Sequence, residues 1–448
     1  MTALAPITCI MALGFSAYMI RRVGYSLAPT KMNFGSFILY FQFFLSAGLG
    51  AILIGAGVSG HYIIDKVITP DLSDRILYSI SYSFVASTAT MYLVLKSLYG
   101  DVQSHVIRSR SSLWIPDGLE SKVFIGLLIA INFVVMLYTI RCIGSIPLLD
   151  LVSGNATMER RIEISRSFPG NEIVKNLFGV TLSLILCFYG VLNVLLNPQR
   201  KTILVCAITL IPAIFFSTYS YEKSPILFLL LGIVMAWIAA KGGVSKIFFA
   251  AFVFLIMSTV IVLYLLLGVD SEDLASSGIT AGPLGRVLFT QIAGMYLSFT
   301  YFPQIHDYVG FASIGGSFSG LFGIEDSSDR VARIIMAIFN PEGVSDGVAG
   351  VVNSYYLAEA WGNFGIAGVI IAPLVVGLWF VLINLFEFGA EKTIFSRAIV
   401  IFFTLKLPLG GGINDFLFSI GLIYVLFLAF LASLVAGFWR IGPFRQRK

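Results

Sequence analysis

Apolar runs of about 20 residues, separated by short polar segments, recur along almost the whole chain. A helix of that length crosses the apolar core of a bilayer, because its backbone polar groups are all satisfied within the helix. The pattern predicts an all-α polytopic membrane protein, a bundle of about eleven transmembrane helices that forms a single membrane domain over residues 1–448. The expected spans are 3–20, 34–57, 76–98, 123–140, 174–197, 202–219, 225–240, 247–268, 364–384, 394–408 and 416–438. The segment 394–408 is short for a crossing, and we expect it to be tilted or broken near Pro408.

The composition agrees with a membrane protein. Of the 448 residues, 58% are hydrophobic and 12% are charged, and the mean hydropathy is +0.92. A soluble domain carries about a quarter charged residues, so this chain has too few charges to cover a water-facing surface. The net charge of +5 comes from basic residues at the ends of apolar runs, so no nucleic-acid partner is expected. The run 3–20 has no positive charge before it and no small-residue cleavage site, which favours a retained span over a signal peptide.

Lysine and arginine cluster in alternate loops, and loops of this kind face the cytoplasm in membrane proteins. The other loops carry acidic residues such as Asp65, Asp71 and Asp270. This distribution predicts a cytoplasmic C-terminus and an N-terminus on the outside. The basic set comprises Arg21, Arg22, Lys31, Arg108, Arg110, Lys122, Arg200, Lys201, Lys241, Lys246, Lys392, Arg397, Arg440, Arg445, Arg447 and Lys448.

Two segments on the outer side are long, and we call 141–175 the first outer segment and 270–356 the long outer segment. Within the long outer segment, Leu284–Tyr301 and Val331–Phe339 are expected to be amphipathic or re-entrant helices at the membrane interface. Gly310–Gly323, which is rich in Gly and Ser, is expected to be irregular. Loops of this length are usually functional or disordered, and their many aromatic side chains argue against disorder.

Cations on the outer side are not explained by topology, and they suggest an anion site. Guanidinium groups suit pyrophosphate because they bind it through paired hydrogen bonds and stay protonated. The alternatives are a solvated helix with i,i+4 charge pairs in the first outer segment and, at the outer mouth of the sixth and seventh spans, a lysine that snorkels beside Glu222. The candidate pyrophosphate ligands are Arg160, Arg161, Arg166, Lys223, Arg286, Arg330 and Arg333.

Two residues are candidates for a general base. His306 is the only histidine of the long outer segment, and an imidazole can take a proton from a hydroxyl near neutral pH. Glu359 stands at the start of an apolar span beside Trp361 and Asn363, where burial would favour a basic carboxylate. The alternatives are an interfacial histidine and a helix-terminal carboxylate without a catalytic role.

Several motifs are absent from the sequence. There is no Walker loop, no G-x-G-x-x-G after a strand, no H-E-x-x-H, no Asp-x-Asp and no C-x-x-C pair among the four cysteines. We therefore expect chemistry that needs neither ATP nor a metal ion nor another cofactor.

Three stretches resemble bacterial O-antigen polymerases, the Wzy-type oligosaccharide repeat unit polymerases. "SYYLAEAWGNFGIAGVIIAPLVVGLWF" (Ser354–Phe380) is similar to the family's segment after the long periplasmic loop, with Glu359 ahead of the Asn-Phe-Gly-Ile stretch. "GSIPLL" (Gly144–Leu149) resembles the start of the family's first periplasmic loop. "STYSYEKSPILFLLLGIV" resembles the family's entry into an apolar helix, with Lys223 where an arginine is more common.

The resemblance implies a glycosyltransferase in the bacterial inner membrane that joins oligosaccharide repeat units carried on undecaprenyl pyrophosphate at the periplasmic face. It also implies membrane lipids as surroundings, with a chain-length regulator and a flippase as partners. The sugar-binding candidates are Tyr301, Tyr308, Asp346 and Asn363. An O-antigen ligase that transfers glycan to lipid A core, a lipid-linked oligosaccharide transporter and a structural membrane protein are the other hypotheses. The transporter is less favoured because the chain shows no internal repeat and its charges collect at the outer side.

Overall fold

The computed structural model describes residues 4–111, 119–153, 160, 164, 168–266, 278–313, 330–347, 349–389 and 393–435. Over these residues the chain is all-helical and contains no strand. Nine helices of the described part are long and apolar enough to cross a membrane, so this is a multi-pass membrane protein. They are Leu4–Val23, Phe34–Gly55, Ser121–Ile143, Glu172–Leu196, Arg200–Thr218, Lys223–Lys241, Lys246–Leu263, Leu357–Phe388 and Ile413–Leu431.

Nine of the eleven predicted spans overlap these helices, and the other two are helical without being among the nine. The segment 76–98 lies in α4 (Pro70–Tyr99), whose many serines and terminal charges make it less apolar. The segment 394–408 corresponds to α20 (Ile394–Lys406), which has 13 residues and ends two residues before Pro408. The expected break near Pro408 is therefore confirmed.

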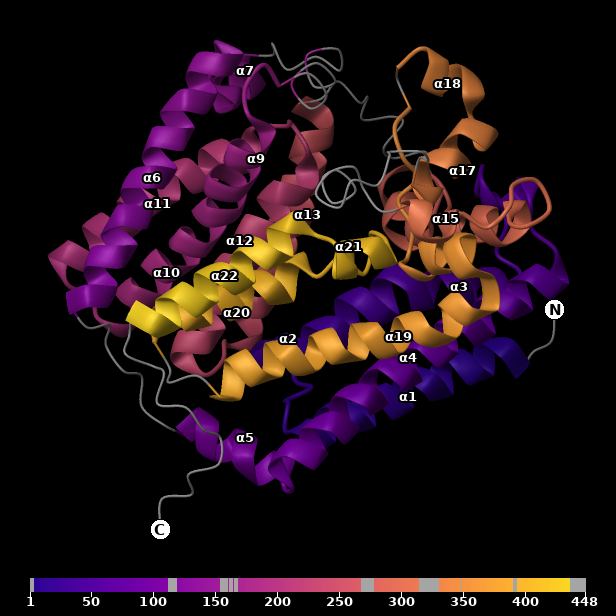
Figure 1. Cartoon of the computed structure of the whole chain (residues 1–448), viewed down its shortest axis with the longest axis horizontal. Helices are drawn as coiled ribbons and strands as arrows, with labels where there is room; N and C mark the ends of the chain where they lie inside the picture. The colour runs from indigo at the N-terminus through magenta and orange to yellow at the C-terminus, as the bar shows by residue number, and fades with distance from the viewer. Residues whose placement is uncertain are drawn as a thin grey trace.

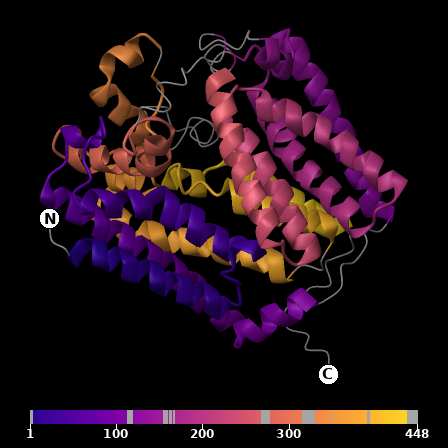
Figure 2. The same cartoon turned by 180° about the vertical axis from the view of Figure 1, so that it is seen from behind.

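The first group of helices contains α1 (Leu4–Val23), α2 (Phe34–Phe37), η2 (Ile38–Gly48), α3 (Leu49–Gly55), α4 and α19 (Leu357–Gly389). Helix α4 packs along both α1 and α19, and the three run side by side (Figures 1 and 2). Its buried hydroxyls bond to carbonyls one turn earlier, as Ser81 does to Leu77 and Ser87 to Ser83, both at 2.6 Å. A serine-rich helix can be buried among apolar helices because these hydroxyls satisfy themselves within the helix.

The second group surrounds α10 (Leu182–Leu196), which packs against α11 (Arg200–Thr218), α12 (Lys223–Lys241) and α20. Residues 182–190 of α10 are all buried, so this apolar helix forms the centre of the group. The remaining members are α6 (Leu119–Ile143), α7 (Pro147–Ser153), α9 (Glu172–Val174), η4 (Lys175–Thr181), α13 (Lys246–Leu266) and α22 (Ile420–Val435). The short α21 (Ile413–Leu417) lies between the two groups (Figure 1).

The two ends of the bundle differ in charge and structure. One end, which we call the basic end, carries Arg21, Arg22, Lys31, Arg200 and Lys241, with α5 (Val102–Ser111) beside it (Figure 1). The opposite end, which we call the loop end, carries α7, α15 (Gly282–Tyr301), α17 (Val331–Phe339) and α18 (Pro341–Ser345).

The two helices predicted within the long outer segment are both present, and they differ in burial. Helix α17 has Val331 and Ile335 buried on one face and Arg333 exposed on the other, as expected for an amphipathic helix. Helix α15 is exposed near its start, at Arg286 and Val287, whereas Ile292 and Tyr296 are fully buried. It packs against η2, α3, α4 and α19, and its position at the membrane interface stays a prediction. Of the predicted irregular Gly310–Gly323, only the 3₁₀ turn Gly310–Ser313 lies within the described residues.

Candidate functional site

Three charged side chains from distant parts of the sequence meet at the loop end. Arg330 precedes α17, Glu359 lies in the first turn of α19, and Asp415 lies in α21. The Nε and Nη2 atoms of Arg330 lie 3.0 and 2.9 Å from Oε1 of Glu359. Its Nη1 donates to Oδ1 of Asp415 at 2.9 Å. We call these three residues the carboxylate clamp, because one guanidinium holds two carboxylates.

Glu359 is the buried member of the carboxylate clamp, with 2% of its side chain exposed. Its second oxygen, Oε2, accepts the backbone N–H of Asn414 at 2.9 Å. Asn414 is itself held by Ser313, whose carbonyl and hydroxyl accept from its side-chain amide at 2.9 and 2.7 Å. Both oxygens of Glu359 are therefore engaged by donors, which is the condition for a carboxylate to remain ionised when buried.

Asp415 and Arg330 are the accessible members. Their side chains are 34% and 36% exposed, and the second oxygen of Asp415 accepts the backbone N–H of Gly412 at 3.1 Å. Burial by itself would lower the pKa of Arg330, but Glu359 and Asp415 together raise it above its ordinary value. Two carboxylates face one guanidinium, so the carboxylate clamp keeps an excess of negative charge with Asp415 nearest to solvent.

The turn between α20 and α21 explains how α21 comes so close to Glu359. A Cβ atom at Gly412 would overlap the carboxylate of Glu359 and contact the guanidinium of Arg330 at 2.5 Å. A Cβ atom at Gly411 would lie 2.6 Å from Asp415. Glycine is required here because the charged groups occupy the space of a side chain.

The start of α19 is held in place by α15 and the residues that follow it. The carbonyl of Gln291 accepts the N–H of Tyr355 at 2.8 Å, and the hydroxyl of Ser298 donates to Ala358 at 2.6 Å. The indole N–H of Trp361 donates to the carbonyl of Phe302 at 3.0 Å. The buried position of α15 therefore serves to fix the helix that carries Glu359.

The two predicted bases have different surroundings. Glu359 lies in the carboxylate clamp, whereas the ring of His306 is exposed, packs against Phe302 and bonds to the carbonyl of Asp307 at 2.7 Å. None of the bonds of the carboxylate clamp involves His306. The structure thus brings one of the two predicted bases together with a predicted cation.

The other cations predicted in the long outer segment are exposed. Arg286 lies in the first turn of α15, and Arg333 lies on the outer face of α17. Although Arg330 and Arg333 are three residues apart, they do not act together, because Arg330 precedes α17 and turns back to Glu359.

The sugar-binding candidates are scattered over the loop end. Tyr301 is buried and Asp346 is exposed near Ser345. Tyr308 is 42% exposed and packs edge-on against Trp361. Asn363 is 1% exposed, and neither atom of its amide has a hydrogen-bond partner among the residues that the structure describes.

Helix α19 is interrupted just after Asn363. Gly365 has φ +57° and ψ −136°, a conformation that a side chain disfavours, and the ring of Tyr308 occupies the place of its Cβ atom. The break separates a short outer piece, with Glu359 and Asn363 one turn apart, from the long apolar remainder. A sequence motif that resembled the start of a span therefore contains a bend.

The first outer segment forms a different cluster around α6 and α11. Arg160 donates to the carbonyl of Ile143 at 3.0 Å, at the end of α6, while Arg161 and Arg166 lie outside the described residues. Tyr221 donates to Asp150 at 2.8 Å, and burial followed by this carboxylate raises its pKa. The hydrogen bond from Arg160 thus caps the C-terminal end of α6.

Two lysines of this half of the molecule lie against aromatic rings. The ammonium of Lys175 is 4.4 Å from the ring centre of Phe168 and 5.0 Å from that of Tyr219. The ammonium of Lys406, at the end of α20, is 4.3 Å from the ring centre of Phe228. Because Phe228 lies five residues after Lys223 on α12, this contact places Lys406 near the loop end of α12, where Lys223 begins the helix.

The sequence-based search did not identify Asp415, Asn414 or Gly412. The signal was present in "GGGIND", where three glycines and a carboxylate interrupt an apolar region directly before the last predicted span. No group of three or more His, Cys, Asp or Glu side chains suited to a metal ion occurs in the described part of the chain. Comparisons with protein-family models, curated proteins and solved structures find no match for this chain.

Proposed function

We propose that this protein is a glycosyltransferase that polymerises oligosaccharide repeat units carried on a lipid pyrophosphate, with its site at the loop end. The observation that carries the proposal is the carboxylate clamp. In it, Arg330 fixes the partly exposed carboxylate of Asp415, and it joins two apolar helices because Glu359 and Asp415 belong to different candidate spans. The resemblance of Ser354–Phe380 to O-antigen polymerases supports the same residues, because that stretch supplies Glu359. In this proposal the loop end faces the periplasm of a bacterial inner membrane and the basic end faces the cytoplasm.

The proposed reaction needs a base and a site for the leaving group. The acceptor hydroxyl oxygen bonds to the anomeric carbon of the donor sugar, and its proton passes to the base. The bond from that carbon to the pyrophosphate oxygen breaks, and the lipid pyrophosphate leaves with the electron pair. No ATP is required because the donor already carries a good leaving group.

Asp415 is the base that the geometry favours. Each of its oxygens accepts one hydrogen bond, and its side chain is accessible, so it can reach an acceptor hydroxyl. Glu359 is less suited because only 2% of its side chain is exposed, whereas 34% of that of Asp415 is. In this assignment Arg330 orients Asp415, and Glu359 holds Arg330.

The leaving pyrophosphate is assigned to other cations. Arg330 already faces two carboxylates, and their excess negative charge would repel a pyrophosphate. Arg286 and Arg333 are exposed at the loop end and keep the role that the sequence suggested for them, as do Arg161 and Arg166. Membrane lipids, a flippase and a chain-length regulator remain the proposed partners.

The first experiment examines surface glycan after deletion of the gene. A polymerase deletion leaves glycan capped with single repeat units, and this is the expected result. Lipid A core without glycan, together with accumulated long lipid-linked polymer, would indicate a ligase instead. Unchanged surface glycan would contradict both enzymes.

The second experiment tests the base. Asp415→Asn, expressed in the deletion strain, should lower the rate of polymerisation by about 10²–10⁴-fold, since this is the usual contribution of a positioned base. Asp71→Asn is the matched control, because Asp71 is 74% exposed at the start of α4 and pairs only with Arg75 among the salt bridges of the described residues. Both proteins must be present in the membrane at equal amounts. Normal glycan length with Asp415→Asn would refute the assignment of the base.

A further inference from the structure

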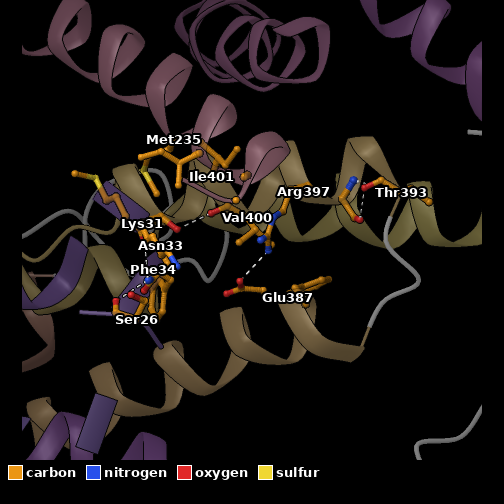
Figure 3. A pocket seen from close by; sticks show the side chains of 17 residues that line it. Ser26, Lys31, Asn33, Phe34, Met235, Glu387, Thr393, Arg397, Val400 and Ile401 are labelled. Atoms are coloured by element: carbon orange, nitrogen blue, oxygen red, sulfur yellow. Dashed lines mark hydrogen bonds and ion pairs between the residues drawn. The ribbon is translucent and has the colours of Figure 1, made fainter. Parts of the chain in front are cut away.

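A cavity of about 250 Å³ lies at the basic end, far along α19 from the carboxylate clamp. It is enclosed by α12, α19, α20 and the chain that connects α1 to α2 (Figure 3). Two of its lining residues, Lys31 and Gly242, are exposed, so the cavity opens at the surface of the basic end.

One wall of the cavity is charged. Arg397 of α20 and Glu387 of α19 form an ion pair, with Nη1 and Oε1 2.8 Å apart (Figure 3). The other oxygen of Glu387 accepts the hydroxyl of Tyr25 at 2.6 Å. The ammonium of Lys31 forms no hydrogen bond or ion pair with any residue that the structure describes. The Arg397–Glu387 pair is neutral, so Lys31 adds one net positive charge to the lining, and an anion is the ligand that suits it.

Another part of the lining is apolar. It is built from Met235 and Ile238 of α12 and from Val400 and Ile401 of α20, all buried in the described structure. Helix α12 is one of the nine candidate spans, so this wall continues into the apolar part of the bundle. A small inorganic anion would leave these side chains without a partner, whereas an amphiphile would contact both walls.

The size of the cavity limits what it can enclose. A pocket that encloses a whole drug-sized molecule has roughly 300–1,000 Å³. A cavity of about 250 Å³ is too small for a whole lipid but sufficient for its headgroup.

We propose that this cavity binds the phosphate headgroup of an anionic membrane lipid, with Lys31 as its direct cationic contact and with Met235 and Ile401 against the start of the chains. The site is distinct from the carboxylate clamp, and it does not depend on the glycosyl transfer proposed above. A lysine beside an exposed opening is suited to this role because a phosphate group needs no fixed orientation at a flexible ammonium.

The test uses the full chain purified in a mild detergent. Phosphatidylglycerol, phosphatidylcholine and inorganic phosphate are added in separate titrations, and native mass spectrometry counts the bound lipid while a thermal melt records Tm. The variants are Lys31→Gln, Lys31→Arg and the control Lys246→Gln. Lys246 is exposed at the same end but does not line the cavity.

Phosphatidylglycerol should bind and raise Tm, and Lys31→Gln should weaken its binding about fivefold, the usual effect of one basic side chain near an anionic lipid. Lys31→Arg and Lys246→Gln should bind as the unaltered chain does. Equal binding by Lys31→Gln and Lys246→Gln would overturn the proposal, as would equal retention of phosphatidylcholine. A full Tm increase with inorganic phosphate alone would also overturn it, since the site would then take a soluble anion.

Discussion

Helix α19 carries a glutamate near each end, and each glutamate is paired with an arginine, yet the two pairs differ. Glu359 at the loop end pairs with Arg330, which is 36% exposed and also holds Asp415. Glu387 at the basic end pairs with Arg397, which is 25% exposed, and receives the hydroxyl of Tyr25. The basic-end pair is neutral and supported by a neutral donor, whereas the carboxylate clamp keeps an additional accessible carboxylate.

Under the proposed function, the difference separates an ion pair that serves structure from one that also serves chemistry. A buried pair stabilises little by itself, because desolvation offsets most of the attraction, but removal of one partner is costly. At the basic end, the pair joins α19 to α20, and Tyr25, two residues after α1, bonds to Glu387. At the loop end, the third residue, Asp415, is 34% exposed, and in the proposed function it takes the proton of the acceptor hydroxyl.

Replacement of Arg330 should have the largest effect. Arg330→Met leaves Glu359 buried without a cation, and loss of one partner of a buried pair costs about 3–5 kcal/mol. The measurement is thermal unfolding in detergent together with glycan chain length in cells. Arg330→Met combined with Glu359→Gln should regain most of the stability but no polymerisation. If the double variant polymerised normally, the carboxylate clamp would be structural like the basic-end pair.

Gly412→Ala should disturb the loop end alone. The added Cβ atom would overlap Glu359 and press on Arg330, and overpacking of this kind costs about 1–3 kcal/mol. Polymerisation should fall with little loss of protein from the membrane. Gly421→Ala is the control, because its Cβ atom would lie at an ordinary 3.6 Å from Ser419. Equal activity in both variants would show that the close approach of α21 is not needed for function.

Tyr25→Phe should affect the basic end alone. The variant removes the hydroxyl that bonds to Glu387 at 2.6 Å and to Asn384 at 3.0 Å, and an unmade buried bond costs about 1–2 kcal/mol. The melting temperature should fall while glycan length is unchanged. Tyr62→Phe, at an exposed position, is the control. A change in glycan length with Tyr25→Phe would mean that the two ends of α19 are coupled.

Replacement of His61 should have the smallest effect. This histidine is an independent source of acid sensitivity at the loop end. Burial lowers the pKa of His61 below its usual 6.5, although Asp65 opposes this. The folded state thus binds fewer protons than the unfolded state, and stability falls as the pH drops from about 6.5 toward the lower folded pKa. Thermal melts at pH 7.5 and 5.5 should show that His61→Gln removes a decrease on the order of 2 °C. An unchanged decrease in this variant would assign the acid sensitivity to other groups.

Much of the membrane architecture could be predicted because it depends on local sequence. Apolar length and the absence of charge place nine spans, and Pro408 marks the break after α20. The packing of α15 could not be predicted, for a physical reason. Its aromatic and polar side chains suit an interface as well as a packed interior, and only the structure shows its contacts with α4 and α19.

The candidate site was predictable only in part. Glu359 and Arg330 stood out as charges beside apolar segments, but 29 residues separate them in the chain. Asp415 lies 85 residues from Arg330, and a lone acidic residue before a predicted span carries no sign of its partner. His306 and Glu359 were both candidates by residue type, and only the tertiary structure shows that Glu359, and not His306, bonds to Arg330.

The sequence by itself determined that this chain is a helical membrane protein, because the length and polarity of a segment decide whether it can leave water. Only the tertiary structure decided which charges meet. The position of Asp415 beside Arg330 depends on the turn at Gly412 and on the packing of α15 beneath α19. Such contacts join buried groups that lie far apart in the sequence, so no local pattern of residues predicts them.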